Sequence, residues 1–151
     1  MPVPAGDRSS HLTGADRTLL DDTIRRAEQA CRAEISVFVG TAEGGARSFA
    51  TSLHNSLVAP SRSILVMVDP TARALEIVTG GWVRRHLSDK QVELVALTMQ
   101  SAFAEGDLVG GLRRGLGRLG RHGRGRALGR GLRGRGGTAA ARGADVGGLE
   151  E

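Results

Sequence analysis

The sequence contains no tyrosine, only 3% aromatic residues and a single cysteine. One cysteine, Cys31, excludes an internal disulfide and a zinc site built from cysteines. No stretch approaches the roughly 18 consecutive apolar residues that a membrane helix requires. Residues 1–14 also lack the apolar segment of a signal peptide. These absences predict a cytoplasmic protein that makes no contact with a membrane.

Basic residues are concentrated at the C-terminal end of the chain. Residues 1–109 carry 11 basic and 13 acidic side chains, whereas residues 110–151 carry 10 arginines, 3 acidic residues and 15 of the 23 glycines. Glycine loses the most backbone freedom on ordering, and this segment has little apolar surface to offset that loss. We therefore predict a flexible N-terminus over 1–11, a folded domain over 12–119 and a disordered Gly/Arg-rich tail over 120–151.

Three segments of the folded domain carry strand patterns. In residues 34–40, Ile35, Val37 and Val39 alternate with Ser36 and Phe38. Residues 63–69 form a continuous apolar run, and residues 74–80 follow a short turn. A helical connection between the first two strands favours a parallel, right-handed crossover, and the short turn requires an antiparallel pair. The sequence thus predicts an α/β fold with a small Rossmann-like mixed sheet flanked by helices.

Helical patterns surround these strands. A helix over residues 14–32 begins at the cap residue Thr13 and carries an apolar stripe that includes Cys31. A second helix lies between the first two strands. A third begins at the capping box of Ser88, and a fourth follows the cap residue Asp107. The fourth contains several glycines, each of which costs about 1 kcal/mol relative to alanine, so we expect it to be weak and to fray.

Several of these segments resemble the TPM domain family. Residues 33–40 resemble its opening strand, residues 64–69 and 74–80 its pair of strands, and residues 103–112 its F-x-x-G-D-x-x-x-G-L ending. The resemblance covers residues 12–119 and is closest to an uncharacterised branch from high-GC bacteria. It implies a Rossmann-like α/β fold. Ser61-Arg62-Ser63 departs from the Asn-Gly pair that many members carry before the second strand.

The resemblance also implies a site, because some members, notably those of plant thylakoids, are linked to phosphatase activity and divalent metal binding. Asp69 ends a buried strand, where ligands gather in open α/β sheets, and Asp107 lies in the matching end motif. Together they are the predicted catalytic and metal-binding carboxylates for Ca²⁺ or Mg²⁺. The alternatives are that Asp69 starts the turn before Pro70 and that Asp107 only caps a helix.

Weaker signals lie elsewhere. Trp82 precedes Arg84 and Arg85, and an aromatic ring beside two arginines can hold a phosphate, although such a tryptophan more often packs over a loop. Three histidines have no partners at metal-ligand spacing, and we expect them at the surface: His11, His54 and His122.

Three functions are compatible with these patterns. The first is a TPM-like binding or interaction module without catalysis, whose partner is an unidentified protein or a phosphorylated small molecule. The second is a weak metal-dependent phosphatase that uses Asp69 and Asp107. The third is nonspecific nucleic-acid binding through the arginine tail, whose side chains would contact phosphates. Alternatively, residues 113–151 are a frameshift product, because GC-rich codons read out of frame yield glycine, arginine and alanine.

Overall fold

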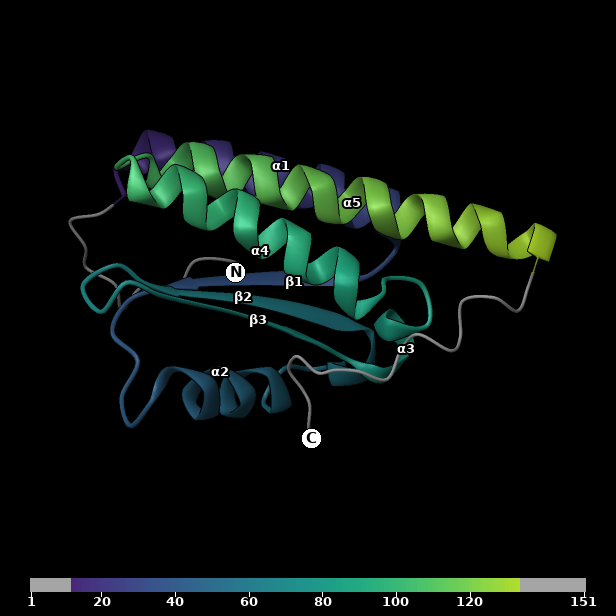
Figure 1. Cartoon of the computed structure of the whole chain (residues 1–151), viewed down its shortest axis with the longest axis horizontal. Coiled ribbons are helices and arrows are strands. Elements are labelled where there is room, and N and C mark those ends of the chain that lie inside the picture. The colour runs from purple at the N-terminus through teal and green to yellow at the C-terminus, as the bar shows by residue number, and fades with distance from the viewer. Residues whose placement is uncertain (1–11, 134–151) are drawn as a thin grey trace.

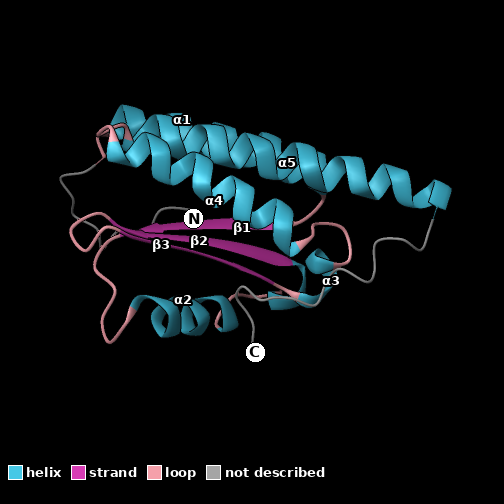
Figure 2. Cartoon of the chain, in the orientation of Figure 1, coloured by secondary structure: helices cyan, strands magenta, loops and turns pink. Residues whose placement is uncertain are grey.

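The computed structural model describes the backbone of residues 12–133 and the side chains of residues 12–123. One three-stranded sheet lies between two helical layers (Figures 1 and 2). Three long helices cover one face: α1 (Gly14–Cys31), α4 (Asp89–Ala104) and α5 (Leu108–Arg133). Helix α2 (Ala46–Asn55) covers the other, and two short helices flank the sheet: η1 (Pro60–Arg62) and α3 (Gly81–Arg84).

The sheet has the predicted topology. Strand β1 (Glu34–Val39) pairs parallel with β2 (Ser63–Asp69), which pairs antiparallel with β3 (Ala74–Thr79), in the order β1-β2-β3. Every residue of β2 is buried, as its continuous apolar pattern requires for a central strand covered on both faces. The α/β fold with a mixed sheet flanked by helices is therefore confirmed.

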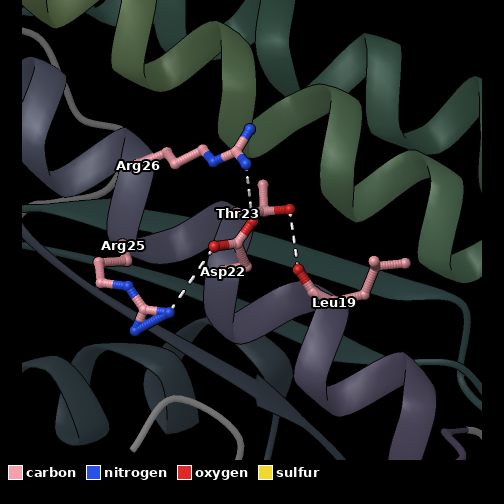
Figure 3. A network of polar contacts seen from close by, with 5 residues as sticks. All are labelled: Leu19, Asp22, Thr23, Arg25 and Arg26. Carbon is pink, nitrogen blue, oxygen red and sulfur yellow. Dashed lines mark hydrogen bonds and ion pairs between the residues drawn. The ribbon is translucent and has the colours of Figure 1, made fainter.

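Helix α1 begins at a complete capping box. Its Thr13 hydroxyl accepts from the Asp16 amide at 3.0 Å, and the Asp16 carboxylate accepts from the Thr13 amide at 2.9 Å. Further along its outer face, Asp22 contacts Arg25 at 3.7 Å and Arg26 at 3.2 Å (Figure 3). These groups are exposed, so the ion pairs contribute little to stability.

Two apolar cores hold the layers together. The larger lies between the sheet and the three long helices and includes fully buried leucines of α1 and α5: Leu20, Leu112, Leu116 and Leu119. The smaller lies between the sheet and α2, where Phe38 and Phe49 meet with ring centroids 5.3 Å apart. The prediction of apolar stripes on both helical layers is thus confirmed.

Helix α5 extends beyond the predicted end of the folded domain. It continues to Arg133, whereas we expected disorder from residue 120 onward. The glycine content predicted disorder, but two of these glycines serve helix packing. Gly120 and Gly123 lie directly against Ala27 and Cys31 of α1, and the absence of a side chain allows the two helices to approach closely. Residues 134–151 of the predicted tail lie outside the described residues, as does the predicted flexible segment 1–11.

Helix α5 is also the longest helix, yet its arginines keep it polar. Across residues 12–133, no helix is both long enough and apolar enough to cross a membrane. Leu116 and Leu119 belong to the segment for which we considered a frameshift, and both are completely buried against the rest of the domain. The cytoplasmic location stays a prediction.

The contact between α1 and α5 makes Cys31 a reporter of helix packing. Replacing Gly123 by alanine is expected to accelerate alkylation of Cys31 several-fold, because the new Cβ would lie 2.6 Å from the Cys31 Cβ and force the helices apart. In the native protein, burial raises the pKa of the Cys31 thiol, so little reactive thiolate exists at pH 8. Mass spectrometry of maleimide labelling measures the rate.

The matched control is Gly117→Ala on the same helix. A Cβ at this position would meet only the mobile end of Arg121, at 3.4 Å. Labelling of Cys31 should therefore stay at the native rate. Equal rates in the Gly123 and Gly117 variants would contradict the packing of α5 on α1.

Candidate functional site

Asp69 lies at the end of β2 and is 4% exposed. One carboxylate oxygen accepts from the Ala42 amide in the β1–α2 loop at 3.0 Å, and the other accepts from the Ala72 amide in the β2–β3 turn at 3.1 Å. Both oxygens therefore join loops at this end of the sheet. Such bonds to backbone amides match the structural alternative for this residue.

Asp107 lies at the start of α5. One of its carboxylate oxygens accepts from the Gly110 amide at 2.9 Å, which is the geometry of a helix cap, and the other contacts Arg114 at 3.2 Å. Its side chain is about half exposed. The predicted capping role of Asp107 is confirmed by these contacts.

The β2–β3 turn and the start of α5 lie at the same end of the molecule's long axis (Figure 1), and each of these segments is contacted by one of the two carboxylates. Each is engaged by its own neighbours. Among the described residues, no three side chains of the acidic, histidine or cysteine types gather in a group that could hold a metal ion. Catalysis and metal binding by Asp69 and Asp107 stay a prediction.

A different cluster of polar groups lies at the opposite end of the sheet. We call it the polar pocket, a depression of about 160 Å³ between the end of α2, η1 and the start of α3. Its polar side chains come from four elements: Thr51, His54, Asn55, Ser61, Thr79 and Arg84. Gly80 and Gly81 complete the wall, so the pocket is formed by segments that lie far apart in the sequence.

His54 fixes the floor of the polar pocket. Its imidazole Nε2 lies 3.0 Å from the Ser63 carbonyl oxygen, and because a carbonyl only accepts, we assign the hydrogen to Nε2. The residue is 5% exposed, so the prediction of a surface position was wrong. This contact joins the end of α2 to the start of β2. Neither the spacing of the histidines nor the composition of the sequence predicts it. His11 lies outside the described residues.

His122 also departs from the expected surface position. It is partly buried, and its Nε2 has no hydrogen-bond partner among the described residues. Burial lowers the pKa of His122, and the positive charges of Arg118 and Arg121 lower it further. The arginines of α5 thus create a positive potential at this point of the helix.

Among the described residues that line the polar pocket, Arg84 carries the only formal charge. Its guanidinium donates to the carbonyl oxygen of Thr79, which also lines the pocket. Within the part of the chain whose side chains are described, no aspartate or glutamate lines the pocket. A guanidinium among hydroxyl and amide groups, without a carboxylate, is the chemistry that receives an anion.

Trp82 has a supporting role beside the polar pocket. Its ring lies between the Arg62 guanidinium, 3.8 Å from the ring centroid, and the His86 ring, 4.3 Å from centroid to centroid. Its backbone amide donates to the Ser61 hydroxyl at 3.2 Å. The ring is thus occupied by protein neighbours, whereas Arg84 from the same sequence cluster faces the pocket.

Sequence reasoning missed Thr51, Asn55 and Ser61 as members of a site. These residues are unremarkable in type, and the fold alone brings them together. The one available signal was Ser61, because it stands in the segment that departs from the TPM pattern before the second strand.

Comparison with known proteins identifies the relatives of this chain. Residues 5–117 match the family model described as Domain of unknown function (DUF5130). Two uncharacterized proteins of Mycobacterium tuberculosis, MT2543 of strain CDC 1551 and Rv2468c of strain H37Rv, are 29% identical to it over 98 residues. The match covers 65% of this chain and 59% of theirs. The resemblance to the TPM family stays a prediction.

Solved structures share the fold. The BA42 protein of Bizionia argentinensis superposes with a TM-score of 0.71 at 20% identity, over 81% of this chain and 88% of that one. The N-terminal domain of the cg2496 protein of Corynebacterium glutamicum superposes with a TM-score of 0.61 at 12% identity, over 100% and 95% of the two chains. At these identities the likeness concerns the fold alone.

Proposed function

Because this chain belongs to the DUF5130 family, whose matched relatives are uncharacterized, we propose its function from its own side chains: a binding module for a small anionic ligand. The observation that supports this proposal is the polar pocket, in which the described neighbours of Arg84 are neutral hydrogen-bonding groups and include no carboxylate. The ligand class is a phosphate or carboxylate group. This develops the first of the functions compatible with the sequence.

The size of the polar pocket limits the ligand. A water molecule takes about 30 Å³ in the liquid, so a pocket of about 160 Å³ has the volume of only a few water molecules. Drug-sized ligands occupy pockets of roughly 300 Å³ or more. The polar pocket therefore suits one oxyanion group, either free or at the tip of a larger molecule that extends into solvent.

The donors in the polar pocket favour binding over chemical turnover. Ser61 accepts from the Trp82 amide, which leaves the hydrogen of its own hydroxyl free to donate. Thr51 and Asn55 supply a hydroxyl and an amide from α2. His54 is the only imidazole among the described lining residues, and its Nε2 hydrogen is bonded to the Ser63 carbonyl, so it does not face the ligand.

Inorganic phosphate at low ionic strength is the direct probe. We expect phosphate to shift the amide resonances of Thr51, Gly80 and Gly81 in a saturable manner. Arg84→Gln should weaken binding about tenfold or more, because a hydrogen bond to a charged group contributes roughly 1.5–3 kcal/mol. Titration by NMR measures both effects.

Arg85→Gln is the matched control, because Arg85 is exposed and does not line the polar pocket. It removes the same charge from the neighbouring position. If both variants lose affinity equally, phosphate senses only the general charge of the surface, and the binding proposal is wrong.

Nucleic-acid binding stays a prediction and is a second candidate function. The arginines that would contact nucleic acid lie in part on an ordered helix rather than in a tail, because Arg113, Arg118 and Arg121 are exposed on α5. Arg114 is paired with Asp107 and contributes less. Phosphorylated small molecules and nucleic acids share the phosphate group, but the polar pocket holds a single group, whereas a helix face would follow a phosphate backbone.

A further inference from the structure

A groove of about 370 Å³ lies beside the first residues of β1 and β2, on the face of the sheet that α2 covers. We call it the apolar groove, because most of its wall is made of apolar side chains: Phe38, Leu53, Leu57, Val58 and Leu65. Val58 is 97% exposed, so this apolar surface is open to solvent. Pockets for small organic ligands begin at roughly 300 Å³. The apolar groove is therefore large enough for an organic molecule, unlike the polar pocket.

Glu34 brings a carboxylate to the apolar groove. It is the first residue of β1, it is exposed, and it lines the groove. Among the described side chains, no lysine, arginine or histidine lines the groove, and none forms an ion pair with Glu34. A carboxylate without a cationic neighbour can accept charge-assisted hydrogen bonds from a ligand. The charge of this groove is thus opposite to that of the polar pocket.

The hydroxyl groups of the apolar groove are arranged as acceptors. The Ser56 hydroxyl donates its hydrogen to the Leu53 carbonyl at 2.8 Å, and the Ser63 hydroxyl donates to the Ala59 carbonyl at 2.6 Å. A hydroxyl has one hydrogen and two acceptor lone pairs, so these two oxygens can only accept from a ligand. Ser63 is also the register partner of Glu34 across the pair of strands, which places a second acceptor beside the carboxylate.

Helix α2 adds to the negative potential at the apolar groove. Leu53 lies in its last turn, and Ser56 is the residue at which the helix ends. The carbonyl end of a helix carries a partial negative charge and favours cations. A carboxylate, two accepting hydroxyls and a helix carboxyl end therefore meet at one apolar surface, and all of them favour a ligand that is positively charged and donates hydrogen bonds.

We propose that the apolar groove binds a small organic amine. Its ammonium group donates to the Glu34 carboxylate and to the Ser63 hydroxyl oxygen, and its hydrocarbon part covers Phe38, Leu57 and Val58. The apolar contact supplies affinity, because it removes exposed hydrocarbon surface from water. The carboxylate supplies specificity for the cation. This site and its ligand class differ from those of the polar pocket, so binding here does not depend on anion binding there.

Three probes with the same hydrocarbon part separate charge from apolar contact: phenylbutylamine, phenylbutanol and phenylbutyrate. We expect the amine to shift the amide resonances of Ser36, Leu57 and Val58 in a saturable manner. It should bind about tenfold more tightly than the alcohol, and the carboxylate should bind least. Titration by NMR measures all three affinities. Equal affinity for amine and alcohol, or saturable shifts at Thr51 and Gly80 alone, would overturn the proposal.

Removing the carboxylate should abolish the preference for the amine. In Glu34→Gln we expect the affinity for phenylbutylamine to fall about tenfold, to that of the alcohol, whereas the affinity for phenylbutanol stays unchanged. Glu93→Gln is the matched control, because Glu93 is exposed on α4, on the other side of the sheet. An equal loss in both variants would show that the amine senses only the net charge of the protein, and would overturn the proposal.

Val58→Ser tests the apolar contact without disturbing a core, because this side chain is almost fully exposed. We expect the affinities for the amine and the alcohol to fall together several-fold. Leu97→Ser is the matched control, since Leu97 is 60% exposed on α4, and it should keep the native affinities. Circular dichroism confirms that all variants are folded. Amine binding that is unchanged in Val58→Ser would place the ligand outside the apolar groove and overturn the proposal.

Discussion

Replacing Gly80 by alanine is expected to lower the free energy of unfolding by about 3 kcal/mol or more. The added Cβ would lie 2.0 Å from the Pro60 carbonyl oxygen and 2.4 Å from the Ser61 carbonyl oxygen. Both are backbone atoms that cannot rotate away, so η1 must separate from the end of β3. The Gly80 amide also donates to Ser63 at 3.0 Å, and that bond would be strained as well.

Gly81→Ala is the matched control for this prediction. Its Cβ would find the Ser61 hydroxyl at 3.9 Å as the nearest neighbour, which is an ordinary contact. We expect its stability to stay within about 0.5 kcal/mol of the native value. Urea denaturation of the two variants measures the difference. A Gly80 variant as stable as the Gly81 variant would show that η1 and β3 do not approach as closely as described.

Replacing Asp69 by alanine is expected to cost about 3 kcal/mol of stability. The substitution leaves the amides of the half-buried Ala42 and of the exposed Ala72 without their acceptor, and an unsatisfied buried donor costs about 1–3 kcal/mol. Asp69→Asn should cost less, because the amide oxygen still accepts one of the two bonds. Thermal and urea unfolding measure both variants.

The same substitutions separate the structural role of Asp69 from the catalytic one. Asp107→Asn serves as the control, because asparagine caps a helix about as well as aspartate. If Asp69 and Asp107 act on phosphate esters through Ca²⁺ or Mg²⁺, both asparagine variants lose a phosphatase activity that the native chain loses on chelation. Activity that is absent in all three proteins, together with the stability loss at Asp69, would end the phosphatase hypothesis.

Local sequence signals predicted most of the fold. The capping boxes at Thr13 and Ser88 are set by side chains three residues apart, so the sequence marks these helix starts directly. The continuous apolar run predicted strand β2, and the short turn after it predicted the antiparallel pairing with β3. Each of these features depends on interactions within a few residues.

Features that depend on distant contacts escaped prediction. His54 is buried at the end of α2, where its Nε2 contacts the carbonyl of Ser63, nine residues further along the chain. The continuation of α5 depends on its contact with α1. By composition, Gly120 and Gly123 favour disorder, but in the fold their lack of a side chain allows α5 to pack closely against α1. The polar pocket exists only once α2, η1 and α3 are assembled, so no stretch of the sequence contains its pattern.

The packing of α5 on α1 has a consequence for synthesis on the ribosome. Helix α1, the first of the described helices, packs against the last of them, since Ala27 contacts Gly120 across nearly the whole described chain. The part of the apolar stripe of α1 that contacts α5 therefore stays exposed to solvent while the strands and α4 are translated. Long-range closure of this kind slows folding and exposes sticky surface. A nascent chain released before α5 is complete should be a preferred substrate for chaperones.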